Sequence, residues 1–108
     1  MVKATSTVRF ARDADGGIRV TVPPDLHPLD DFLETDLGDS ASALDQVVGR
    51  VRDGGADPWA FGGDCCHLTV HADEVLIEND FTGARVTLSR AEFLAIADDF
   101  ARAVHEPR

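Results

Sequence analysis

Two cysteines and two histidines lie within one short stretch, and their types are the ones in this sequence best suited to chemistry. If the stretch is a β-strand, alternate side chains share a face, which groups Cys65, His67 and His71. Residues two apart on a strand are about 6.5–7 Å from each other, close enough to share a metal ion, and both residue types bind zinc. Structural zinc sites usually combine a CxxC pair with a second distant pair, which this sequence lacks. The spacing therefore favours Cys66 in the core and both histidines on a solvent-facing sheet surface.

A catalytic cysteine is the second chemistry to consider. A nucleophilic thiol needs its pKa lowered by a cation or a helix N-terminus. Cys65 instead has Asp64, Asp73 and Glu74 nearby in the sequence, and negative charge raises a thiol pKa. We therefore predict no enzyme activity, no catalytic residues, no cofactor and no metal. A zinc-dependent or cysteine-dependent enzyme that uses Cys65, His67 and His71 remains an alternative.

Adjacent carboxylates occur as Asp30-Asp31 and Asp98-Asp99. Neighbouring positions on a helix point in different directions, so neither pair forms an acid/base dyad by itself.

Neighbouring cysteines rarely form a structural disulfide, which fits a reducing cytoplasm. The sequence shows no apolar run of membrane-spanning length and no hydrophobic signal segment at its start. We therefore expect a soluble, cytoplasmic protein.

The charge balance limits the classes of partner. The 108 residues contain twenty acids and ten bases, which gives a net charge of −10, and the pI is about 4.5. Phosphate backbones and anionic membrane surfaces repel such a chain. We therefore predict neither a nucleic-acid partner nor a membrane partner.

The acids are also unevenly placed along the chain. Neither 20–49 nor 53–84 contains a lysine or an arginine, and each stretch holds seven acids. Any one of these acids is readily explained as a solvated side chain that favours solubility. If the two stretches fold beside one another, however, they form a surface of one sign that attracts a cationic partner.

Hydrophobic periodicity and turn residues predict the elements that position these groups. Strands at 5–12 and 18–22 form a hairpin through the glycine-rich turn 13–17. A short helix begins near Leu29 and is closed by Gly38, and a longer one runs from 39 or 40 to 53; one helix kinked at Gly38 is the alternative.

The second half of the chain continues with a loop at 57–63 and three strands that end at Leu88. Ser89 and Glu92 then form a capping box that opens a helix with one continuous apolar stripe. The prediction is a single α+β domain of order ββααβββα, with one layer of antiparallel strands packed against helices.

The segment from Leu44 to Val104 resembles a known bacterial family. The shared features are ALD at 43–45 in a helix, PWAFGGD at 58–64, LTV at 68–70, VLIEN at 75–79, VTLS at 86–89 and EFL at 92–94. This pattern is similar to the immunity proteins of contact-dependent growth inhibition and related polymorphic toxin systems, and to YacL-type proteins of the same build. The resemblance implies a cytoplasmic inhibitor that binds a cognate protein toxin, in many cases a nuclease with a basic cleft.

Combined with this resemblance, the charge layout predicts which acids contact the toxin. The predicted contacts are Asp30, Asp31, Glu34, Asp36 and Asp39, with a second patch formed by Glu74, Glu78 and Asp80. The alternative from the same resemblance is a YacL-like regulatory or housekeeping interaction protein that has no toxin partner.

Overall fold

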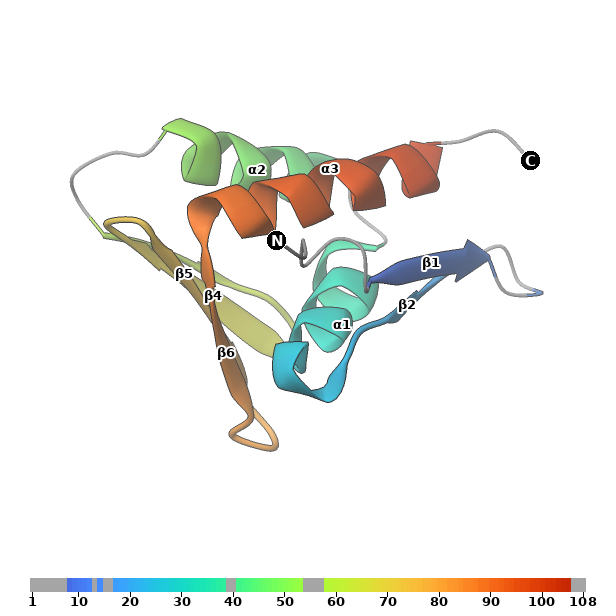
Figure 1. Ribbon diagram of the computed structural model, residues 1–108, viewed down its shortest axis with the longest axis horizontal. Helices are drawn as coiled ribbons and strands as arrows, with labels where there is room; N and C mark the ends of the chain where they lie inside the picture. The colour runs from blue at the N-terminus through green and yellow to red at the C-terminus, as the bar shows by residue number, and fades with distance from the viewer. Residues whose placement is uncertain (1–7, 13, 15–16, 39–40, 54–57, 106–108) are drawn as a thin grey trace.

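A computed structural model describes residues 8–12, 14, 17–38, 41–53 and 58–105. Two antiparallel sheets and three α-helices make up this part of the chain (Figure 1). The α+β fold class predicted from the sequence is therefore confirmed.

The first two strands form the predicted hairpin. β1 (Arg9–Arg12) pairs antiparallel with β2 (Ile18–Thr21), and Phe10 lies opposite Val20. The Phe10 ring packs on Phe100, with ring centroids 5.8 Å apart. The hairpin is a sheet of its own, so the prediction of a single layer of strands is wrong.

A helical segment follows and carries the first group of acids. After the 3-10 turn η2 (Pro24–Leu26), the short helix α1 (Leu29–Asp31) continues directly into the π-helical segment η3 (Phe32–Leu37). Its apolar side chains Leu29, Phe32 and Leu33 are fully buried. The chain then enters α2 (Ala41–Asp53), whose predicted stripe buries Leu44, Val47 and Val51.

Gly38 ends the π-helical segment as predicted, but for a different physical reason. Its φ of −64° and ψ of −32° are right-handed helical values, which any residue can adopt. A Cβ at this position would instead collide with the backbone carbonyl of Glu34. The wide turn of the π-helix therefore requires a residue without a side chain here.

The second sheet contains four strands in the order β3-β4-β5-β6. Their bounds are β3 (Trp59–Gly62), β4 (Cys66–His71), β5 (Glu74–Asn79) and β6 (Arg85–Ser89). The prediction of a loop at 57–63 missed β3, so the order of the described elements is ββααββββα, with one more strand than predicted. The proline and glycines at both ends of 58–63 indicated a loop, and the short apolar alternation between them was too brief to indicate a strand. In the structure, Trp59 lies opposite Val70 and Phe61 lies opposite Leu68.

Helices cover one face of this sheet. Cys66, Leu68 and Val70 alternate inward on β4, and Val75 and Ile77 do the same on β5. They join the buried face of α3 (Arg90–His105), which carries Phe93, Ile96 and Phe100. The α3 helix begins with the predicted capping box, because the Glu92 amide donates to Ser89 Oγ at 3.0 Å.

The turn between β5 and β6 lies at the end of the sheet away from α2 and α3 (Figure 1). There the sheet adjoins η3, which brings the two acidic stretches of the sequence together. None of the described helices is long and apolar enough to cross a membrane.

Candidate functional site

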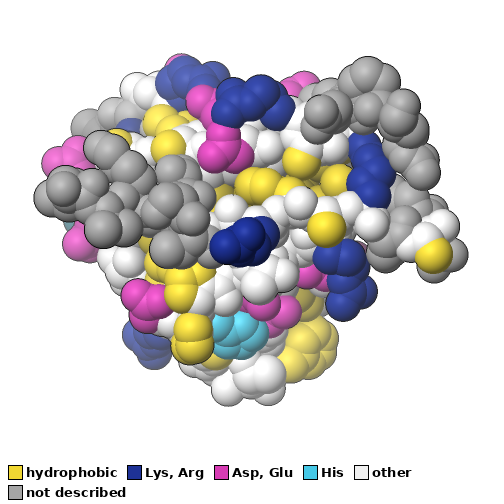
Figure 2. Space-filling model, turned by 45° about the vertical axis from the view of Figure 1, so that its right-hand side comes forward, with side chains coloured by type: hydrophobic (Ala, Val, Ile, Leu, Met, Phe, Trp, Pro, Cys, Tyr) yellow, Lys and Arg dark blue, Asp and Glu magenta, His cyan; other side chains and the backbone are white. Residues whose placement is uncertain are grey.

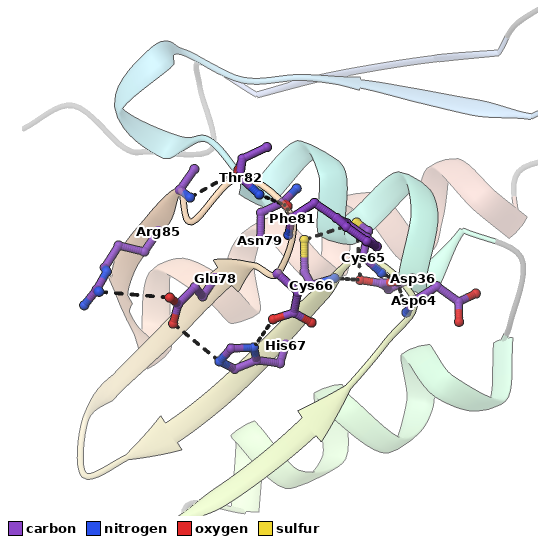
Figure 3. Close-up of polar contacts among 12 residues, drawn as sticks. Asp36, Asp64, Cys65, Cys66, His67, Glu78, Asn79, Phe81, Thr82 and Arg85 are labelled. Carbon is purple, nitrogen blue, oxygen red and sulfur yellow. Dashed lines mark hydrogen bonds and ion pairs between the residues drawn. The ribbon is translucent and has the colours of Figure 1, made fainter.

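Asp36 joins the π-helical segment to the turn between β3 and β4 (Figure 3). Its Oδ1 accepts hydrogen bonds from the backbone amides of Asp64 at 2.6 Å and Cys65 at 3.0 Å. Its Oδ2 accepts from the amide of Cys66 at 2.9 Å. Three successive N–H groups that point at one carboxylate make a concave anion site, which is occupied here by a side chain of the same protein. Asp36 was predicted to contact a toxin, and the structure gives both of its oxygens an internal role.

Gly63 makes this joint possible. A Cβ on Gly63 would overlap the Asp36 side chain, so any other residue would push the carboxylate out of place. The Gly63 amide also donates to the carbonyl of Cys66 at 2.9 Å and thereby closes the turn. The sequence marks Gly63 only as a turn residue, since nothing local shows that Asp36 approaches it.

The two thiols lie behind the same carboxylate. Cys65 Sγ is 3.2 Å from Cys66 Sγ and 3.8 Å from Asp36 Oδ2. Desolvation is the main cause that raises the pKa of each thiol, and the negative charges of Asp36 and Asp31 add to it. Both cysteines therefore favour the protonated form, and Cys66 packs in the core as predicted, with no exposed area.

His67 and His71 share the outward face of β4 as predicted, but Cys65 does not lie on it. Cys65 precedes β4 and turns toward Asp36, because its amide and the next one are both bound there. His67 contacts acids on the other face of the sheet, and His71 is exposed at the far end of β4. Among the described residues the cysteines instead group with Asp36, with potential ligand atoms within 4.8 Å of one another. A metal ion there would have to displace two thiol protons and compete with three backbone amides, so the geometry fits a structural joint better than a ligand set.

Asn79 is the one buried polar residue among those described, and no local pattern in the sequence singled it out. Its Nδ2 donates to Asp31 Oδ2 at 3.0 Å, and its Oδ1 accepts from the amides of Phe81 at 2.8 Å and Thr82 at 3.0 Å. The signal that could have found it is an Asn just before a Thr-Gly turn, because Asn side chains bind the backbone of such turns. Asn79 therefore ties the β5–β6 turn to α1.

His67 lies in a row of charged groups on the outer face of the sheet (Figure 3). Its Nδ1 is 2.6 Å from Asp80 Oδ1, and its Nε2 is 3.5 Å from Glu78 Oε1. Arg85 approaches the second Glu78 oxygen at 4.0 Å. Glu74 is on the same face but four residues away along β5, about 13 Å from Glu78. The predicted second patch therefore divides, with Glu78 and Asp80 at one end of the strand and Glu74 at the other.

The remaining predicted contacts of the first patch have individual partners. Asp30 Oδ1 is 2.9 Å from His27 Nδ1, and Asp31 Oδ2 is 3.7 Å from His27 Nε2. Glu34 Oε2 accepts the backbone N–H of Val20 at 2.8 Å, which ties η3 to the hairpin. Asp39 lies outside the described residues.

Acids from both base-free stretches meet around the C-terminal end of β5, where the turn to β6 begins. We name this surface the acidic end and define it by Asp30, Asp31, Asp64, Glu78 and Asp80. It is joined across the two stretches by the Asn79–Asp31 bond and by the Asp36 joint. Within the second stretch, the Asp80 amide donates to the Cys65 carbonyl at 2.8 Å. By contrast, Figure 2 views the molecule from the side of the β1–β2 hairpin. On that face, basic and acidic side chains are mixed.

Comparisons with protein-family models, with curated proteins and with solved structures found no match to this chain.

Proposed function

We propose that this protein is a cytoplasmic immunity protein that binds and neutralises a cognate protein toxin, and that the acidic end is its contact surface. The observation that carries the proposal is the meeting of the two base-free stretches at one place on the surface. Such a surface attracts a cationic cleft, and a nuclease needs a cationic cleft to hold the phosphates of its substrate. The resemblance of 44–104 to immunity proteins supports the same partner.

The internal bonds of the acidic end also favour binding. Asp31 is held by Asn79, and Asp80 is held by His67, yet their side chains keep 36% and 47% of their area exposed. Side chains already held in place lose less conformational entropy when a partner arrives. The acidic end therefore combines exposed charge with fixed geometry.

The direct test uses the toxin domain encoded by the gene immediately upstream, purified as a catalytically inactive variant. We expect a 1:1 complex whose association rate falls at least tenfold between about 50 and 500 mM NaCl, because salt screens long-range attraction. An equimolar amount of the protein should also stop the activity of the wild-type toxin. Absence of a complex would contradict the immunity function and leave the YacL-like alternative, and a salt-independent rate would contradict the electrostatic contact.

A matched pair of double variants locates the surface. Asp64→Asn with Asp80→Asn removes two charges from the acidic end, and Asp45→Asn with Asp53→Asn removes two from the exposed side of α2. Each pair changes the net charge from −10 to −8, so bulk charge is the same in both. We expect the first pair to slow association several-fold more than the second. Equal effects would show that net charge alone, and not the acidic end, attracts the partner.

Asp31 and Glu34 are less suitable for this test, although both are predicted contacts. Each accepts an internal hydrogen bond, from Asn79 and from the Val20 amide respectively. Reversing their charge would disturb the fold as well as the surface.

A further inference from the structure

Phe81 is the one large apolar side chain among the described residues that is left exposed, with 79% of its area accessible. The other phenylalanines lie in the core or pack partly against it. The β5–β6 turn uses the backbone N–H of Phe81, a group that almost any residue would supply. The aromatic ring therefore has no evident role in folding, and an exposed aromatic ring is a common feature of binding surfaces.

The turn that carries Phe81 is held by several hydrogen bonds. Asn79 Oδ1 accepts the amides of Phe81 and Thr82, and the Asn79 carbonyl accepts the Gly83 amide at 2.9 Å. The Ala84 amide donates to Thr82 Oγ1 at 3.2 Å, and Gly83 takes the positive φ of 78° that the turn requires. Because the base of this turn is the buried Asn79, the backbone of Phe81 is held in place before any partner binds. Figure 3 shows the hydrogen bonds between Asn79 and the turn.

Phe81 also lies within the acidic end. Asp80 precedes it directly, and the side chain that caps its amide is the one bonded to Asp31. An apolar group with charged groups around it is the usual arrangement of an interface centre and its rim. A cleft that binds single-stranded nucleic acid has the complementary arrangement, because it combines base-stacking apolar surface with Arg and Lys for the phosphates.

We propose that Phe81 is the anchor of the toxin interface and inserts into an apolar pocket of the toxin that is bordered by Arg and Lys. This inference rests on the proposed function, and it names the residue that holds the complex together once charge has attracted the partner. The carboxylates of Asp31 and Asp80 then pair with the cations at the border of the pocket. The two contributions separate kinetically, because rim charge acts mainly on association and buried anchors act mainly on dissociation.

The test measures association and dissociation of the inactive upstream toxin domain with Phe81→Ala, Phe81→Leu and the wild type. We expect Phe81→Ala to speed dissociation about thirtyfold, the effect typical of an aromatic anchor, while the association rate stays within twofold of the wild type. Phe81→Leu should recover part of the lost affinity because it restores apolar volume. Since the ring is exposed, the melting temperature of both variants should match that of the wild type.

The outcomes separate this inference from the proposed function. If the wild type binds the toxin with a salt-dependent association rate but Phe81→Ala dissociates within twofold of it, the anchor is wrong and the immunity function stands. If the wild type does not bind the toxin, the proposed function fails and the anchor fails with it. The Asp45→Asn, Asp53→Asn pair on α2 is the matched control, because both residues lie outside the acidic end and their removal should leave dissociation unchanged.

Discussion

At the scale of single residues, Asp36 connects regions of the chain that are distant in sequence. Its carboxylate accepts the amides of residues 28 to 30 positions away, and the neighbouring thiols fill the space behind it. Hydrogen bonds to an ionised acceptor are stronger than those between neutral groups. The joint therefore holds the first group of acids against the sheet.

We predict that Asp36→Asn destabilises the protein. The amide side chain has one acceptor oxygen in place of two, so at least one of the three backbone N–H groups loses its partner. The expected loss is about 1–3 kcal/mol in the free energy of unfolding, measured by urea denaturation. Asp45→Asn, on the exposed side of α2, is the control and should stay within about 0.5 kcal/mol. Equal stability of the two variants would contradict the structural role of Asp36.

The thiols predict a loss of stability at alkaline pH. Burial raises the pKa of Cys65 and of Cys66 in the folded protein, so their contribution is complete below the unfolded value near 9 and declines above it. Above that value, each thiol that stays protonated in the folded protein lowers the free energy of unfolding by about 1.4 kcal/mol per pH unit. The sequence has no tyrosine and only one lysine, so few other groups titrate in this range.

Urea denaturation between pH 8 and pH 10.5 in a reducing buffer checks this dependence. Cys66→Ala, which removes the fully buried thiol, should be less stable at pH 8 but should have a shallower pH slope. A slope that is unchanged in this variant would show that other groups cause the alkaline loss.

At the scale of elements, two glycines in neighbouring helical segments are expected to behave in opposite ways. A Cβ at Gly38 would collide with the Glu34 carbonyl, whereas a Cβ at Gly49 on α2 would meet nothing within 4 Å. Gly38→Ala should therefore cost about 1–3 kcal/mol, because the backbone of η3 must shift. Gly49→Ala should stabilise by about 0.5–1 kcal/mol through helix propensity. Thermal or urea unfolding measures both, and stabilisation by Gly38→Ala would contradict the close approach at the end of η3.

At the scale of the whole molecule, the net charge of −10 opposes folding through repulsion. We predict that NaCl raises the melting temperature, by about 4–8 °C if screening adds about 1 kcal/mol. If the proposed toxin complex forms, the same salt should weaken it, so stability and affinity should respond in opposite directions. Calorimetry in 0.05 and 0.5 M NaCl, repeated with KCl, is the measurement, and a melting temperature that falls with both salts would contradict the repulsion.

The elements with strong local signals were predictable from the sequence. The hairpin, the stripe of α2, the alternation of β4 and β5 and the capping box at Ser89 depend on residues a few positions apart. The two base-free stretches were visible for the same reason, since charge is a property of each residue type.

The tertiary structure alone decided how these parts combine. β3 is a strand because Trp59 and Phe61 find partners on β4, and the strands separate into two sheets with helical segments between them in the chain. It also decided that Asp36 turns inward while Asp80 stays exposed, through contacts between residues far apart in sequence. Local composition carries no information about such distant pairs, which form only when the chain packs. The acidity was thus determined by the sequence, whereas the position of the acidic end, with Phe81 within it, depended on the fold.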